Sequence, residues 1–91
     1  MTKTEIAEII VGMLRELQIA SGDMGCEITP MVVPLSALGF FDSLLAIETT
    51  LVLEERLGYP CGEISIFTDQ ETSQPLTITA IASRLAQKVV A

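Results

Sequence analysis

Aliphatic residues near the N-terminus recur with helical spacing, and this pattern constrains the fold more than any other feature of the chain. Six of them fall at positions i, i+3, i+4, i+7, i+8 and i+11: Ile6, Ile9, Ile10, Met13, Leu14 and Leu17. This spacing lines one face of an amphipathic helix. Thr2 and Glu5 fit a capping box, so we expect the helix to begin within the first few residues. Gly22 and Gly25 mark the region where it ends.

A second helix is predicted over residues 44–57. Asp42 and Ser43 are both good N-cap residues, the stretch contains neither Gly nor Pro, and Gly58 closes it. One face of this helix carries Ala46, Leu53 and Leu57 together with Thr50. The other face carries Leu44, Ile47 and Leu51 beside Glu48 and Glu55. A single core cannot bury both faces, so the second is either covered by a neighbouring loop or left exposed to receive a partner.

The rest of the chain is predicted to hold two more helices and two loops. Residues 20–41 form a long loop interrupted by Pro30 and Pro34, and its apolar residues would pin it to the core: Ile28, Met31, Val32, Val33, Leu35 and Leu38. A short third helix is predicted at the apolar cluster of Ile64, Ile66 and Phe67. Residues 69–75 are a polar loop, and Thr77 or Thr79 opens the last helix. Near its end, Arg84 and Lys88 would suit the negative pole of the helix dipole.

The expected fold is therefore all-α, with four helices, a long first loop and a short third helix in one domain over residues 1–91. Hydrophobic residues make up 49% of the chain but aromatic residues only 4%, which favours a core of aliphatic side chains between packed helices. The length suffices for one core and not for two.

Charge and residue types exclude several classes of function. The formal net charge of -7 argues against binding to nucleic acid or to an anionic membrane, and favours a basic partner. The chain has no His, which excludes a Ser-His-Asp or Cys-His mechanism and a His-containing zinc site. Cys26 and Cys61 lack the spacing of a redox or metal pair, and their roles stay open.

Location is predicted from the N-terminal residues and the apolar runs. Charged residues interrupt the apolar residues at the N-terminus, which is unlike a secretory signal. No apolar stretch approaches the roughly twenty residues that span a bilayer. We expect a cytoplasmic monomer with reduced thiols.

The segment Leu38-Gly39-Phe40-Phe41-Asp42-Ser43-Leu44 joins the long loop to the second helix. A Ser at this point presents its hydroxyl on a firm support, and the free amides and positive pole of the helix favour a phosphodiester on that oxygen. Asp42 could orient a metal-bound cofactor during attachment. Taken alone, Asp-Ser-Leu at a helix start is a weak motif that ordinary capping explains better than modification does.

The layout around this segment resembles the acyl carrier protein family, including the peptidyl carrier domains of modular synthetases. The resemblance covers nearly the whole chain: the helix order, the long first loop, Asp42-Ser43-Leu44, the acidic second helix, and Leu53-Glu54-Glu55-Arg56-Leu57-Gly58 behind it. It implies that Ser43 carries 4'-phosphopantetheine from coenzyme A, with Asp42 as the acid before the attachment Ser. The thiol of that arm would hold an acyl or aminoacyl group as a thioester, so the chain itself would need no catalytic residue or metal.

The resemblance also implies a docking surface on the second helix. Its residues would be Leu44, Ile47, Glu48, Leu51 and Glu55. The implied partners are a phosphopantetheinyl transferase and acyl-loading ligases or synthases with basic patches. Carboxylates would steer such enzymes in, while a few apolar anchors supply modest affinity.

Several residues depart from the family pattern. Leu45 stands where fatty-acid carriers usually have a polar residue, Arg56 interrupts the acidic end of the helix, and Thr49 and Thr50 replace aliphatics that face the core. These departures favour a free-standing carrier of a specialised fatty-acid, polyketide or related pathway.

Two other functions compete with the carrier. One is a helical adaptor that docks through the second helix and is never modified, with Ser43 only a cap. The other is an enzyme using Asp42 and Ser43, or an acidic metal cluster among Glu48, Glu54, Glu55 and Asp69. The enzyme lacks a general base, and calcium-loop spacing is absent.

Overall fold

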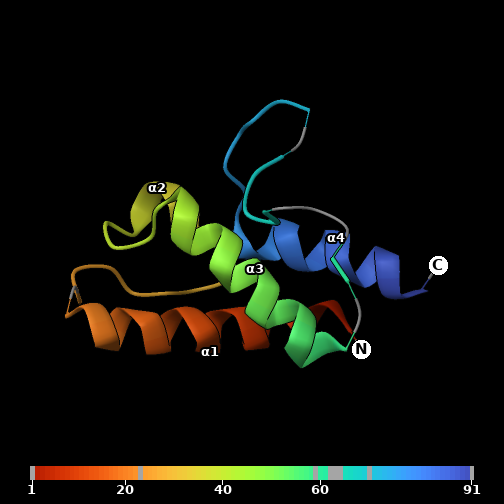
Figure 1. Cartoon of the computed structure of the whole chain (residues 1–91), viewed down its shortest axis with the longest axis horizontal. Helices are drawn as coiled ribbons and strands as arrows, with labels where there is room; N and C mark the ends of the chain where they lie inside the picture. Colours follow the sequence, from red (N-terminus) through yellow and green to blue (C-terminus); the bar gives the residue numbers. More distant parts are fainter. Residues whose placement is uncertain (1, 23, 59, 62–64, 70, 91) are drawn as a thin grey trace.

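The computed structural model describes residues 2–22, 24–58, 60–61, 65–69 and 71–90, with residues 88–90 as backbone alone. Four helices account for most of this part of the chain: α1 (Lys3–Ser21), α2 (Pro34–Ala37), α3 (Ser43–Leu57) and α4 (Ile78–Val90). Figure 1 shows α3 running obliquely over α1, while α4 packs along α1. The described residues contain no strand beyond one isolated bridge, between Thr68 and Pro75. The predicted all-α class is confirmed.

Both predicted ends of α1 are confirmed. The Thr2 hydroxyl accepts a hydrogen bond from the Glu5 amide, and the Glu5 carboxylate accepts one from the Thr2 amide, each at 3.1 Å. Gly22 ends the helix with φ of 79°, and its amide donates to the carbonyls of Gln18 and Ile19. A left-handed residue closes a helix in this way because its amide turns back to the last free carbonyls.

Two glycines of this region should respond oppositely to alanine. Gly12 lies inside α1, and a Cβ placed there meets nothing within 4 Å. Gly12→Ala should therefore raise the free energy of unfolding by about 0.5–1 kcal/mol. Gly22→Ala should lower it by about 1–2 kcal/mol, because φ of 79° is strained for an L side chain. Urea denaturation followed by circular dichroism measures both, and equal signs would contradict the assigned backbone conformations.

Four buried residues attach α3 to the core: Ala46, Thr49, Thr50 and Leu53. The Thr50 hydroxyl donates to the Ala46 carbonyl at 2.8 Å and accepts from the Ile66 amide at 3.2 Å. A polar residue is thus satisfied at a fully buried position. The hydroxyl also ties α3 to the segment that follows it.

The short helix does not lie where the sequence predicted it. Within the described residues, 66–67 form a turn and 65–69 contain no helix, while Ile64 lies outside them. Ile66 and Phe67 are buried as expected, but the Ile66 amide bonds to Thr50 instead of to a helical carbonyl. The short helix is α2, inside the predicted long loop, where Pro34 occupies its first turn. Proline is well suited to that position because its φ is already helical and no amide is required.

The long loop is held at both ends, although one of its predicted pins is wrong. Ile28 and Leu38 are buried, and Val32, Val33 and Leu35 are half-buried, but Met31 is 72% exposed. Gln18 on α1 donates to the Cys26 carbonyl at 2.6 Å. The backbone amide and hydroxyl of Thr79 both donate to the Pro30 carbonyl. The loop therefore bridges α1 and the start of α4.

The start of α4 follows the sequence prediction, whereas the role expected for Arg84 is wrong. The Thr77 hydroxyl accepts from the Ala80 amide at 3.1 Å, so Thr77 caps the helix. Arg84 lies in the middle of α4 and not in its last turn. Its guanidinium donates to the Asp69 carboxylate at 2.6 Å. The side chain of Lys88 lies outside the described residues.

Candidate functional site

Ser43 is the first residue of α3, and its side chain is exposed. The residue two positions before it is an anchor: the Phe41 ring is buried and lies 4.9 Å from the Phe67 ring in an edge-to-face contact. Phe40 adds a second edge contact to Phe41 at 6.4 Å. Such ring pairs contribute stability beyond the area they bury. The exposed residue Ser43 therefore follows, two positions later, a Phe41 side chain that is packed firmly in the core.

Asp42, and not Ser43, caps α3. The Asp42 carboxylate accepts from the Leu45 amide at 2.8 Å, and the Asp42 carbonyl accepts the first intrahelical bond, from Ala46. The amides of Ser43 and Leu44 precede that bond and have no acceptor within the helix. The Ser43 hydroxyl is left outside the capping arrangement, at the positive end of the helix dipole.

An open hollow of about 580 Å³ borders Ser43. On one side it is lined by α2 and the turn before α3, and on the other by the loop that precedes α4. Its lining residues are Leu35, Ser36, Leu38, Gly39, Phe41, Asp42, Ser43, Thr68, Ser73 and Pro75. The exposed residue Ser43 therefore borders a space that a flexible substituent can occupy.

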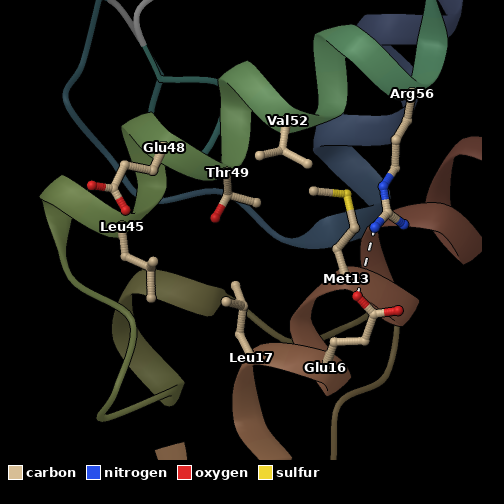
Figure 2. Close-up of a pocket in the computed structure, with 8 residues that line it drawn as sticks. All are labelled: Met13, Glu16, Leu17, Leu45, Glu48, Thr49, Val52 and Arg56. Carbon is tan, nitrogen blue, oxygen red and sulfur yellow. Dashed lines mark ion pairs between the residues drawn. The ribbon is translucent and has the colours of Figure 1, made fainter. Parts of the chain in front are cut away.

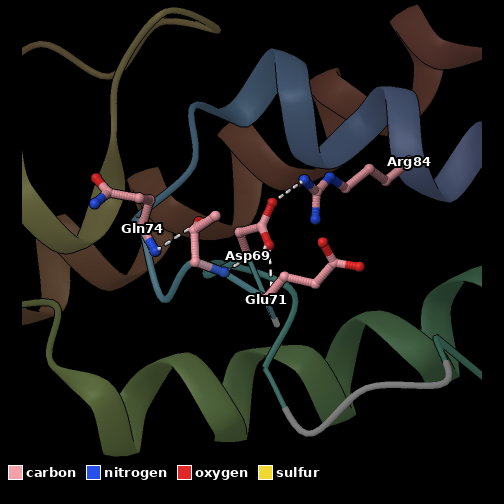
Figure 3. Close-up of polar contacts among 5 residues, drawn as sticks. Asp69, Glu71, Gln74 and Arg84 are labelled. Carbon is pink, nitrogen blue, oxygen red and sulfur yellow. Dashed lines mark hydrogen bonds and ion pairs between the residues drawn. The ribbon is translucent and has the colours of Figure 1, made fainter.

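The loop before α4 is braced by Asp69 (Figure 3). One carboxylate oxygen accepts from the amides of Glu71 and Thr72, at 2.8 and 3.2 Å, and the other accepts from Arg84. The hydrogen bond from Arg84, followed by those two backbone hydrogen bonds, lowers the pKa of Asp69. The Asp69 amide also donates to the Gln74 carbonyl at 2.9 Å. These bonds fix the loop that forms one wall of the hollow.

The second apolar face of α3 is largely exposed, so the first of the two alternatives, that a neighbouring loop covers it, is wrong. Leu44 is 65% exposed and Leu51 58%, while Ile47 is half-buried. Glu48 and Glu55 are exposed as well. We call these five residues the outward face of α3. Together they present apolar side chains among carboxylates, on the helix that begins at Ser43.

A groove of about 240 Å³ between α1 and α3 was not predicted from the sequence (Figure 2). Its lining residues are Met13, Glu16, Leu17, Leu45, Glu48, Thr49, Val52 and Arg56. Leu45 lines this groove because of the way α3 crosses α1. Glu48 lies at the border between this groove and the outward face.

The residues considered for metal or thiol chemistry do not form a site. Among the described residues, no three Cys, Asp or Glu side chains are grouped so that they could hold a metal ion. Cys26 is half-buried and Cys61 is buried, and both are free thiols. None of the described helices combines the length and apolar character that crossing a membrane requires.

The chain was compared with known proteins, and no similar protein was found. No family model, curated protein or solved structure matches the chain.

Proposed function

We propose that the protein is an acyl carrier protein that bears 4'-phosphopantetheine on Ser43. The observation that carries the proposal is the position of Ser43: the residue is exposed, it is not the cap of α3, and it borders an open hollow. The arm would supply a terminal thiol that holds an acyl or aminoacyl group as a thioester. The chain supplies the attachment oxygen and the surface that partner enzymes recognise.

The start of α3 fits a phosphodiester on Ser43. The amides of Ser43 and Leu44 have no helical acceptor, and the helix dipole favours negative charge near them. Asp42 would keep the hydrogen bond that it accepts from the Leu45 amide. Attachment at Ser43 would therefore not break the cap of α3. The arm would leave the surface beside the hollow, whose far wall is the loop braced by Asp69 and Arg84.

The outward face of α3 supports the partners that we propose, a phosphopantetheinyl transferase and acyl-loading enzymes with basic patches. Its carboxylates belong to a chain of net charge -7, which speeds the approach of a basic surface. Leu44 and Leu51 supply exposed apolar anchors two helical turns apart on that face. A few anchors give modest affinity and rapid release, which suits a carrier that visits several enzymes.

Intact mass spectrometry tests the proposal. The purified protein is incubated with coenzyme A, magnesium and a broad-specificity phosphopantetheinyl transferase. We expect a gain of one phosphopantetheine, and peptide mapping should place it on Ser43 and not on Ser36, which also borders the hollow. A gain on another residue, or none while a known carrier in the same reaction is modified, would contradict the proposal.

The exposed apolar residues of the outward face also favour a second candidate, an unmodified adaptor that docks through α3. This candidate needs Ser43 only as the first residue of the helix. The mass experiment separates the two functions, because the adaptor gains no mass under any condition that modifies a carrier.

A further inference from the structure

The groove between α1 and α3 is open to solvent, and most of its lining side chains are apolar. Residues spaced about one helical turn apart form its α3 wall. Among them Leu45 is half-buried and Val52 is 42% exposed. Met13 and Leu17 form the α1 wall. Figure 2 shows the side chains of all four directed into the space between the two helices. An aliphatic groove between two helices is a surface on which a third helix can pack.

The two ends of the groove differ in charge. At one end Glu16 and Arg56 form an ion pair at 3.6 Å, which joins α1 to α3 and largely neutralises both groups. At the other end Glu48 is exposed, and within the described part of the chain it pairs with no cation. One unbalanced carboxylate therefore stands beside Leu45, on a chain of net charge -7.

We infer that this groove binds an amphipathic helix of a partner protein. An aliphatic side chain of that helix would contact the apolar lining of the groove, and a Lys or Arg of the same helix would lie beside Glu48. A second copy of this chain is disfavoured because two acidic chains repel each other. The α3 wall from Leu45 to Arg56 is about 16 Å long, which matches about three turns of a partner helix. An engineered cavity of about 150 Å³ holds a benzene molecule, so a groove of 240 Å³ has room for a side chain of Leu size.

This groove shares only Glu48 with the outward face of α3, and the inference does not depend on modification of Ser43. Leu45, Thr49 and Val52 line the groove, whereas Leu44 and Leu51 lie on the outward face. Glu48 belongs to both surfaces, so the substitutions below avoid it. The unmodified full chain can therefore be used to test the groove, and failure of this inference would leave the mass experiment on Ser43 unaffected.

The test uses methyl NMR of the protein labelled at its methionines. The probe is a synthetic helical peptide with Leu at positions i and i+4 flanked by Lys, and its control carries Glu in place of each Lys. We expect the basic peptide to shift the Met13 methyl signal, because Met13 lines the groove. The signals of Met24 and Met31, exposed at 63% and 72% outside it, should stay in place. Raising the salt concentration should weaken binding.

Matched charge substitutions locate the binding site. Val52→Glu should raise the dissociation constant of the basic peptide at least about tenfold, a loss typical of a central interface residue. Ile19→Glu adds the same charge at a residue 70% exposed outside the groove and should change it less than about twofold. Circular dichroism checks that both variants fold. Leu51→Glu probes the outward face and should also have the smaller effect.

Each alternative occupant gives a different result. Equal loss in Val52→Glu and Leu51→Glu, or a shift of Met24 and Met31 with Met13 unmoved, would place the peptide elsewhere and overturn the inference. So would equal binding of the acidic peptide. A Met13 shift that depends on protein concentration alone would indicate a second copy. A Met13 shift that follows only acyl loading at Ser43 would assign the groove to the cargo.

Discussion

Ser43→Ala protein will gain no phosphopantetheine and will remain as stable as the wild type, if the chain is a carrier. The side chain is exposed and takes no part in capping α3, so its loss should change the free energy of unfolding by less than about 0.5 kcal/mol. Loading, in contrast, should fall to zero because the attachment oxygen is gone. Intact mass and urea denaturation measure the two effects separately.

Asp42→Ala is the matched control for this variant. It removes the carboxylate that accepts from Leu45, and should cost about 1 kcal/mol as the loss of a helix cap. The Ser43 oxygen remains, so the variant should still be modified in part. If Ser43→Ala loses as much stability as Asp42→Ala, Ser43 is also a capping residue. Residual loading of Ser43→Ala would show that another residue is the attachment site.

The contrast between Asp42 and Ser43 shows which details of a helix start the local sequence can predict and which it cannot. A helix start near these residues was predictable because both types accept hydrogen bonds from free amides. Which of the two does so depends on backbone angles that the sequence does not state. Gly22 and Gly58 were read correctly as helix ends because a left-handed residue is a local requirement.

Contacts between distant residues account for the errors in the predicted fold. The apolar residues near Phe67 suggested a short helix, but the Ile66 amide bonds to Thr50, sixteen positions earlier in the chain. Arg84 suggested a contribution to the helix dipole, but it bonds to Asp69, fifteen positions earlier. No periodic pattern records such pairs, since each is set by how the elements pack.

The features of the candidate site also fall into two groups: those that the local sequence predicts and those that depend on how distant segments pack. The exposed face of α3 was a predicted alternative, because its apolar residues form a second stripe on one helix. The hollow beside Ser43 and the groove between α1 and α3 each combine side chains from segments far apart in the sequence. Their existence depends on the path of the loop before α4 and on the way α3 crosses α1.

Phe67→Ala should be the most destabilising single change proposed for this chain, at about 3–5 kcal/mol. The ring is fully buried and forms the edge-to-face contact with Phe41, so truncation leaves a cavity beneath the turn that carries Ser43. A loss of this size is a large part of the roughly 5–15 kcal/mol that a typical domain has in total. Urea denaturation followed by circular dichroism gives the value.

The same substitution tests whether the Phe41–Phe67 contact supports the start of α3. Hydrogen exchange at the Ala46 amide, which closes the first turn of α3, should accelerate more than exchange at Leu14 in the middle of α1. Phe40→Ala is the control, because Phe40 is half-buried and lies farther from Phe41, and it should cost about 1 kcal/mol. If Phe67→Ala does not fold, Phe67→Leu keeps most of the apolar volume and should show the same local change at lower cost. Uniform acceleration across both helices would mean that Phe67 stabilises the whole core and gives Ser43 no particular support.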